Sequence, residues 1–162
     1  MSQVEYFYEG ESEKKLITYL KDKGIIKQGK VRKFNLWEGD INRIIRMLSK
    51  SSELYFIIDT DTLTNKQLFK DNLKKLKGYN VCLIVQNKNL EDELSYVCEQ
   101  TKDQLFTEFG ACNKNEFTSK FIQANLAGKF KNCDFEKLWS RDAEFKKFLE
   151  ENYINVNITW RQ

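Results

Sequence analysis

Short apolar runs alternate along the chain with longer segments in which apolar residues recur every three or four positions. The short runs are rich in β-branched and aromatic residues, which favours strands, and the longer segments have the periodicity of amphipathic helices. Alternation of this kind predicts an α/β fold, with a mostly parallel sheet of four to five strands flanked by helices. The expected strands are Val4–Tyr8, Val31–Leu36, Leu54–Ile58 and Val81–Val85, and the expected helices between them are residues 12–24, 40–48 and 63–76.

The pattern becomes more helical after residue 88. The expected helices there are Leu90–Cys98, Glu116–Leu126 and Asp134–Leu149, and the alternation in Ile154–Trp160 is typical of an edge strand. The sequence contains no proline that would mark a linker, and no internal repeat. A chain of 162 residues has a common single-domain length, so we expect one domain over residues 1–162, with residues 130–162 as a helical C-terminal extension.

The charges of the chain nearly balance, with 27 basic and 24 acidic residues and a net charge of +3. This sum alone does not indicate nucleic acid or an acidic membrane surface as a partner. Lysines are concentrated in three stretches, each of which is compatible with a solvated helix face or with a surface that contacts a phosphate backbone. The stretches are Lys14–Lys33, Lys66–Lys77 and Lys114–Lys131.

The four cysteines form no CxxC pair and the sequence contains no histidine, so a structural zinc site is not expected. The lack of histidine also excludes Ser-His-Asp and Cys-His catalysis by this chain. No apolar run has the length of a signal peptide or of a membrane span. We therefore expect a reducing, cytoplasmic setting without membrane contact, in which Cys82, Cys98, Cys112 and Cys133 are free thiols.

Two acidic motifs follow predicted strands directly. Glu9 comes after the first strand, where Gly10 is expected to permit a sharp turn, and Asp59 and Asp61 come after the third strand. The carboxyl ends of parallel strands meet at one edge of a sheet, so we expect these three carboxylates to gather there. Their mutual repulsion requires a compensating cation, and hard oxygen ligands favour Mg²⁺ or Mn²⁺ over zinc.

Acidic residues near helix starts have a second interpretation. They cap the helix and complement its dipole without taking part in any chemistry. For each acidic motif taken singly this role is an alternative, and for Glu11 and Glu13 a capping or surface role is the simpler interpretation.

The segment FYEGESEKKL, followed about fifty residues later by FIIDTDT, resembles the Toprim domain shared by topoisomerases, bacterial primases and several nucleases. The spelling EGESEKKL is most similar to the Toprim domains of overcoming-lysogenization-defect nucleases and related phage-defence proteins. This resemblance spans roughly residues 3–130. It implies a Toprim-like, Rossmann-type sheet and hydrolysis of phosphodiester bonds.

The resemblance also implies roles for particular residues. Glu9 matches the glutamate of the family's first motif, which is a metal ligand or a general acid/base. Glu13 and Glu91, the latter in LEDEL, match two further acidic ligands of the nuclease subgroup. Lys120, in FTSKF, matches a lysine near the active site. For Glu91 and Lys120 a solvated surface position is the alternative. The implied catalytic residues are Glu9, Asp59, Asp61 and Lys120, and the implied metal ligands are Glu9, Glu13, Asp59, Asp61 and Glu91.

The resulting hypothesis is a Mg²⁺- or Mn²⁺-dependent nuclease that acts on DNA or RNA, in phage defence or RNA processing. The overcoming-lysogenization-defect nucleases carry an ATPase domain ahead of the Toprim domain. This chain has no GxxxxGK[ST] loop, so we expect any ATPase to be supplied by another protein. The tyrosine-bearing domain that topoisomerase chemistry needs is not expected either.

Two alternatives remain open at this point. The first is a non-catalytic Toprim-like module that binds or regulates a partner. Its interaction face would consist of aromatic residues of the later helices, for which core packing is the simpler interpretation. These residues are Phe117, Phe121, Trp139 and Phe145. The second is a phosphorelay receiver domain with Asp59 as phosphoacceptor. Receivers place paired acids after the first strand, whereas here the pair follows the third.

Overall fold

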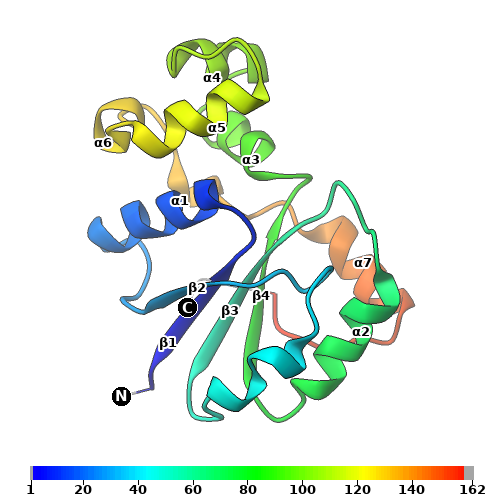
Figure 1. Ribbon diagram of the computed structural model, residues 1–162. Coiled ribbons are helices and arrows are strands. Elements are labelled where there is room, and N and C mark those ends of the chain that lie inside the picture. The colour runs from blue at the N-terminus through cyan, green and yellow to red at the C-terminus, as the bar shows by residue number, and fades with distance from the viewer. Residues whose placement is uncertain (1, 159–162) are drawn as a thin grey trace.

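The computed structural model of the chain describes residues 2–158. At its centre lies a sheet of four parallel strands in the order β2-β1-β3-β4, with helices on both faces (Figure 1). The predicted α/β class with a parallel sheet is therefore confirmed. The strands are β1 (Val4–Tyr8), β2 (Lys30–Lys33), β3 (Glu53–Asp59) and β4 (Asn80–Gln86).

Two hydrophobic cores, one on each face of the sheet, explain why the middle strands have continuous apolar sequences. Along β3, Tyr55 and Ile57 point into one core, whereas Leu54, Phe56 and Ile58 point into the other. A parallel strand that is covered on both faces has no solvated side, so its sequence does not alternate. Strands β3 and β4 pair along their whole length, which brings their carboxyl ends level with each other.

The helices that cover the sheet form two groups, which contribute to different hydrophobic cores. One core takes most of its helical side chains from α1 (Glu11–Asp22), α3 (Leu90–Val97) and α5 (Lys114–Gln123), with Leu105 and Leu126 added by the two short helices next to α5. The other core takes its α-helical side chains from α2 (Lys66–Lys75) and α7 (Ala143–Glu151). Figure 1 shows α4 (Lys102–Glu108) and α6 (Leu126–Lys129) beside α5, in a helical layer beyond the carboxyl end of the sheet. No helix within residues 2–158 is both long and apolar enough to cross a membrane.

The aromatic residues assigned to an interaction face in the binding-module alternative belong to these cores instead. Phe117 and Phe121 of α5 are fully buried, and Trp139 and Phe145 are almost so. The prediction of core packing is confirmed for all four, and a docking surface built on them is wrong.

The helix expected over residues 40–48 is wrong. Two short 3₁₀ turns, η1 (Ile41–Arg43) and η2 (Ile45–Met47), take its place. The break lies at Ile44, whose φ of −120° departs from α-helical backbone. Ahead of it, the buried side chain of Asn72 in α2 fixes the start of η1: its oxygen accepts the N–H of Ile41 at 2.9 Å, and its amide donates to the carbonyls of Leu36 and Gly39.

The helix expected over Asp134–Leu149 is interrupted as well. Its first part is a 3₁₀ turn, η3 (Phe135–Lys137), and α7 begins only at Ala143. Trp139 lies between them with a φ of 55°, which right-handed helices do not permit. Its backbone N–H donates to the buried carboxylate of Glu93 at 3.2 Å, and this contact with α3 outweighs the local helical periodicity.

Other element boundaries shift by a few residues. The second strand is shorter than predicted. Helix α2 starts at Lys66 and is capped by the side chain of Asn65. The helix expected over Glu116–Leu126 is divided into α5 and α6. The segment expected to form the edge strand makes one isolated parallel bridge, between Asn157 and Cys82. The N–H of Leu83 donates to the carbonyl of Asn157 at 2.7 Å. Residues 159 and 160 of that prediction lie outside the described residues.

The cysteines correct another prediction. Cys98 and Cys133 form a disulfide, whereas Cys82 and Cys112 are free. The expectation of four free thiols is therefore wrong for the first pair. The bond joins the end of α3 to the segment before η3, where the N–H of Asp134 also donates to the carbonyl of Val97 at 2.9 Å. The fold thus brings together two positions that are 35 residues apart.

Candidate functional site

Three adjacent strands end at one edge of the sheet, and a polar residue stands at each end. Glu9 follows β1, Asp59 closes β3 and Gln86 closes β4. The N–H of Asp59 donates to Oε1 of Glu9 at 3.4 Å, although the two residues are 50 positions apart. Parallel pairing of β1 with β3 and of β3 with β4 causes this convergence, because it sets the strand ends side by side.

Gln86 lies at the centre of the site and is completely buried. Its Nε2 donates to Oδ1 of Asp59 at 2.5 Å and to Oε1 of Glu13 at 3.4 Å. Its Oε1 accepts the indole N–H of Trp139 at 3.4 Å. An indole N–H can only donate, so the amide oxygen has to face Trp139 and the amide NH₂ has to face the carboxylates.

Sequence reasoning missed both Gln86 and the link from it to Trp139. The available signal was positional: Gln86 is the polar residue that ends an apolar strand, in register with Asp59 on the neighbouring strand. The contact with Trp139 spans 53 positions and has no local signature.

Glu13 enters the site from the first turn of α1. Its Oε2 accepts the N–H of Gly10 at 3.0 Å, which caps the helix, while its Oε1 faces Gln86. Glu13 is 8% exposed, whereas Glu11 in the same turn is exposed. The capping role, expected for Glu13 as the simpler interpretation, is therefore present, and it coexists with a position beside the other carboxylates of the site.

Asp61 lies at the exposed side of the site. Its Oδ2 accepts a hydrogen bond from Nδ2 of Asn89 at 3.2 Å, and its backbone N–H donates to the carbonyl of Lys88 at 3.0 Å. The hydroxyl of Thr60 donates to the carbonyl of Gln86 at 2.8 Å. These bonds tie the loop after β3 to the loop after β4, so the position of Asp61 is set by both.

Glu91 faces the cluster from the first turn of α3 and is buried. Its Oε2 lies 3.9 Å from Nζ of Lys114, which starts α5. Lys120 is exposed in the last turn of the same helix and forms no ion pair among the described residues. Lys114 is thus the lysine that the structure brings to the acidic residues.

The other acidic residues of LEDEL have a structural role. The carboxylate of Glu93 is buried and accepts the backbone N–H groups of Asn87 and Trp139. The guanidinium of Arg141 lies 3.2 Å from the carboxylate of Asp92 and 3.7 Å from that of Glu93. This network holds the segment after η3 against α3, next to the acidic site.

The electrostatics of the cluster oppose its full ionisation. Burial, followed by the charges of Asp59 and Glu13, raises the pKa of Glu9 to about 9. Burial and the charge of Glu13 raise the pKa of Asp59 to about 7, although the hydrogen bond from Gln86 acts in the opposite direction. Burial also raises the pKa of Glu13, and the charge of Glu91 adds to that increase. A nearby cation would relieve this repulsion.

The residue types suit a hard divalent cation, because all their potential ligand atoms are carboxylate oxygens. Within residues 2–158, however, no three aspartate, glutamate, cysteine or histidine side chains are arranged to hold a metal ion. Glu9, Glu13 and Asp59 are each turned toward an N–H donor of the protein. To bind a shared cation, these carboxylates would have to turn from those donors toward a common point.

Comparison of the chain with protein-family models, with curated proteins and with solved structures gives no match to any of them.

Proposed function

We propose that this chain is a metal-dependent phosphodiesterase of the Toprim type, which hydrolyses DNA or RNA with Mg²⁺ or Mn²⁺. The observation that supports this best is the gathering of Glu9, Glu13 and Asp59 at the carboxyl edge of the sheet, where burial and mutual repulsion raise their pKa values. Ionised carboxylates that are clustered and desolvated destabilise the folded protein unless a cation neutralises them.

In this proposal Glu9, Asp59 and Asp61 hold the metal, with Glu13 and Glu91 completing the set of oxygen ligands. Bound divalent ions supply an activated water and stabilise the leaving oxygen of the phosphodiester. The buried amide of Gln86 orients the carboxylates of Asp59 and Glu13 through hydrogen bonds to both.

A lysine beside the metal ligands would neutralise the developing phosphate charge. Lys114 is suited to this by its contact with Glu91, and Lys120 is the lysine that the Toprim resemblance implies. The same resemblance extends the proposal to phage defence and to an ATPase partner supplied by another protein.

A non-catalytic binding module is the second candidate. It is favoured by the fact that Glu9, Glu13 and Asp59 already have N–H donors as partners, which is compatible with a purely structural cluster. The two candidates differ in one measurable property, which is cleavage of a nucleic acid.

The test is cleavage of labelled DNA and RNA with Mn²⁺, with Mg²⁺ and with EDTA. The wild type is expected to cleave only with metal, and Glu9→Gln is expected to lose this activity because it removes charge and basicity without changing size. Glu11→Gln is the matched control, since Glu11 is an exposed carboxylate two residues away and outside the cluster. Equal cleavage by purified Glu9→Gln and wild type would contradict the proposed site. No cleavage by a wild type that binds Mn²⁺ would favour the binding module.

A further inference from the structure

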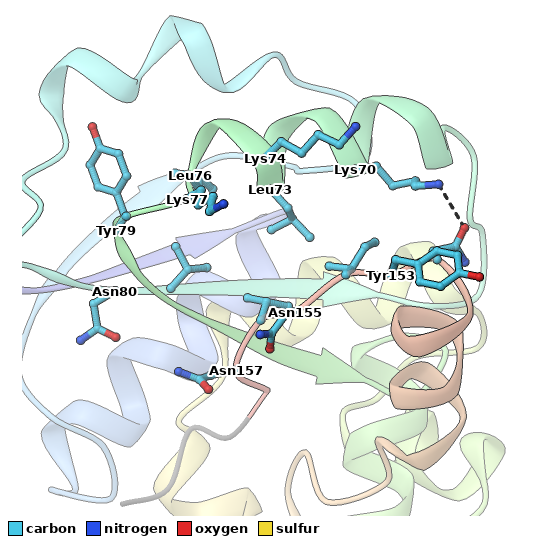
Figure 2. A pocket seen from close by; sticks show the side chains of 15 residues that line it. Lys70, Leu73, Lys74, Leu76, Lys77, Tyr79, Asn80, Tyr153, Asn155 and Asn157 are labelled. Atoms are coloured by element: carbon cyan, nitrogen blue, oxygen red, sulfur yellow. Dashed lines mark hydrogen bonds between the residues drawn. The ribbon is translucent and has the colours of Figure 1, made fainter.

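A cavity of about 620 Å³ lies at the opposite end of β4 from the acidic site. It is bounded by the second half of α2, the turn that leads into β4, and the C-terminal segment 152–157 (Figure 2). Cavities of about 300–1,000 Å³ are typical of ligand sites. Strand β4 has seven residues and spans about 20 Å. The cavity and the acidic site are separated by this distance, so they are two different sites.

The floor of the cavity is apolar and its rim is polar. Leu76 and Val81 belong to the core beneath α2, and Leu73, Ile154 and Val156 pack against that core. The rim carries four asparagines, of which Figure 2 labels three; they are Asn80, Asn152, Asn155 and Asn157. Such a cavity offers an apolar surface to a flat group and amide hydrogen bonds around it.

Three lysines line the same cavity, and their spacing places them on one side of α2 and the turn after it. They are Lys70, Lys74 and Lys77. No aspartate or glutamate of the described chain lines this cavity. Lys74 and Lys77 form no ion pair within residues 2–158, whereas Lys75, which does not line the cavity, pairs with Asp40 at 3.2 Å. The positive charge at the cavity is therefore not compensated locally, and it attracts anions.

Two tyrosines complete the rim. Tyr153 is 96% exposed, with a backbone φ of 56°, and Figure 2 shows its ring at the edge of the cavity. Lys70 donates to the side-chain oxygen of the preceding residue, Asn152, at 3.4 Å. Tyr79 is half-buried at the other end of the lining. Nucleobases stack on exposed aromatic rings beside lysines, and this combination is typical of single-strand-binding surfaces.

We infer that this cavity binds single-stranded nucleic acid, with phosphates at the three lysines and an unstacked base against the apolar floor and Tyr153. A duplex keeps the faces of its bases stacked on one another, so it cannot present them to the floor or to the tyrosine. The inference rests on the proposed function for its substrate class. Binding at the cavity, however, requires neither metal nor the acidic residues, so it is a second contact for the same strand.

The test is binding of labelled single strands of DNA and RNA of about 12 nucleotides, within the site sizes of known single-strand binders, and of duplexes of the same length. Binding is measured by fluorescence anisotropy in EDTA. The full-length wild type is expected to bind, with an affinity that falls as salt rises. Lys74→Ala/Lys77→Ala is expected to weaken binding and to make the slope of log K against log salt shallower by about 0.7 for each phosphate that is no longer neutralised. Comparison of the DNA and RNA arms identifies the preferred strand.

Lys30→Ala/Lys33→Ala is the matched control, because it removes the same charge from exposed positions on β2, at the opposite edge of the sheet. It is expected to leave the affinity within about twofold of the wild type. Tyr153→Ala, at a position with almost no burial to lose, is expected to weaken binding by at least about fivefold because the ring no longer stacks on a base.

Three results would overturn the inference: no single-strand binding in EDTA, equal weakening by the two lysine double substitutions, or equal affinity for duplex and single strand. Failure of the metal-dependent cleavage test leaves this binding in EDTA unaffected, so the two proposals fail separately.

Discussion

At the scale of single residues, Gly10 and Glu13 act as a pair. The sequence predicts a sharp turn at Gly10, but its φ of −134° is extended backbone that any residue adopts. A Cβ at Gly10 would lie 2.9 Å from Oε2 of Glu13. Glycine therefore matters at this position because it leaves space for the Glu13 carboxylate, which enters the acidic cluster through that space.

The raised pKa values of Asp59 and Glu9 make stability depend on pH. Both acids hold their protons in the folded protein up to pH values at which the unfolded chain has already released them. Their contribution is fully present below the unfolded pKa values, near 4, and is lost as pH rises through about 7 for Asp59 and about 9 for Glu9. In EDTA, the melting temperature is therefore expected to fall between about pH 5 and pH 9.

Glu9→Gln/Asp59→Asn removes both titrations and is expected to flatten this decline, which thermal melts across the same pH range would measure. Glu11→Gln serves as the control and is expected to retain the decline of the wild type. A double variant whose melting temperature changes with pH as the wild type does would show that these two groups titrate normally.

At the scale of elements, the segment between η3 and α7 supports the acidic site. Trp139 reaches β4 through its indole N–H and α3 through its backbone N–H. Arg141, whose Cζ lies 4.0 Å from the centroid of the Tyr96 ring, adds contacts to Asp92 and Glu93. The broken helix at this point is thus the feature that allows Trp139 to orient Gln86.

Gln86→Leu tests this support. It removes the amide that binds Asp59 and Glu13, two of the proposed metal ligands. Loss of a hydrogen bond to a metal ligand typically lowers metal affinity by about 10- to 100-fold. Calorimetric titration with Mn²⁺ is expected to show this loss. Trp139→Phe, which keeps an aromatic side chain but removes the N–H donor, is expected to show a smaller loss of the same kind. Unchanged Mn²⁺ affinity in a folded Gln86→Leu would mean that the hydrogen bonds of Gln86 do not support metal binding.

At the scale of the whole molecule, the disulfide closes a loop that contains α4, α5 and α6. Cys98 and Cys133 are the two ends of this loop, and their bond restricts the unfolded chain more than the folded one. The loop carries Lys114 and Lys120, so the bond also limits how far these lysines can move from the strand ends.

Cys98→Ser/Cys133→Ser is expected to lower the free energy of unfolding by about 2–4 kcal/mol under non-reducing conditions. Denaturant titration measures this change, and peptide mass spectrometry without reductant is expected to show the linked peptides. Cys112→Ser is the matched control, because that cysteine is exposed and free. A wild type whose stability is the same with and without reductant would contradict a stabilising bond.

The pattern of residues along the chain was sufficient to predict the class of fold and to select the acidic candidates at the strand ends. Apolar runs such as Leu54–Ile58 carry a local signal of buried strands, and strand-helix alternation requires parallel pairing. That topology sets Glu9 beside Asp59, although their proposed metal-binding role stays a prediction.

The distant groups that surround these acids could not be predicted in this way, because they depend on how the elements pack. Gln86 with Trp139, Glu91 with Lys114, and Cys98 with Cys133 are pairs chosen by the packing of the later helices. The same packing broke the helix predicted over Asp134–Leu149, because the φ of 55° at Trp139 serves contacts with α3 and β4. Periodicity reports only which face of an element is buried, and it contains no information about the partner buried against that face.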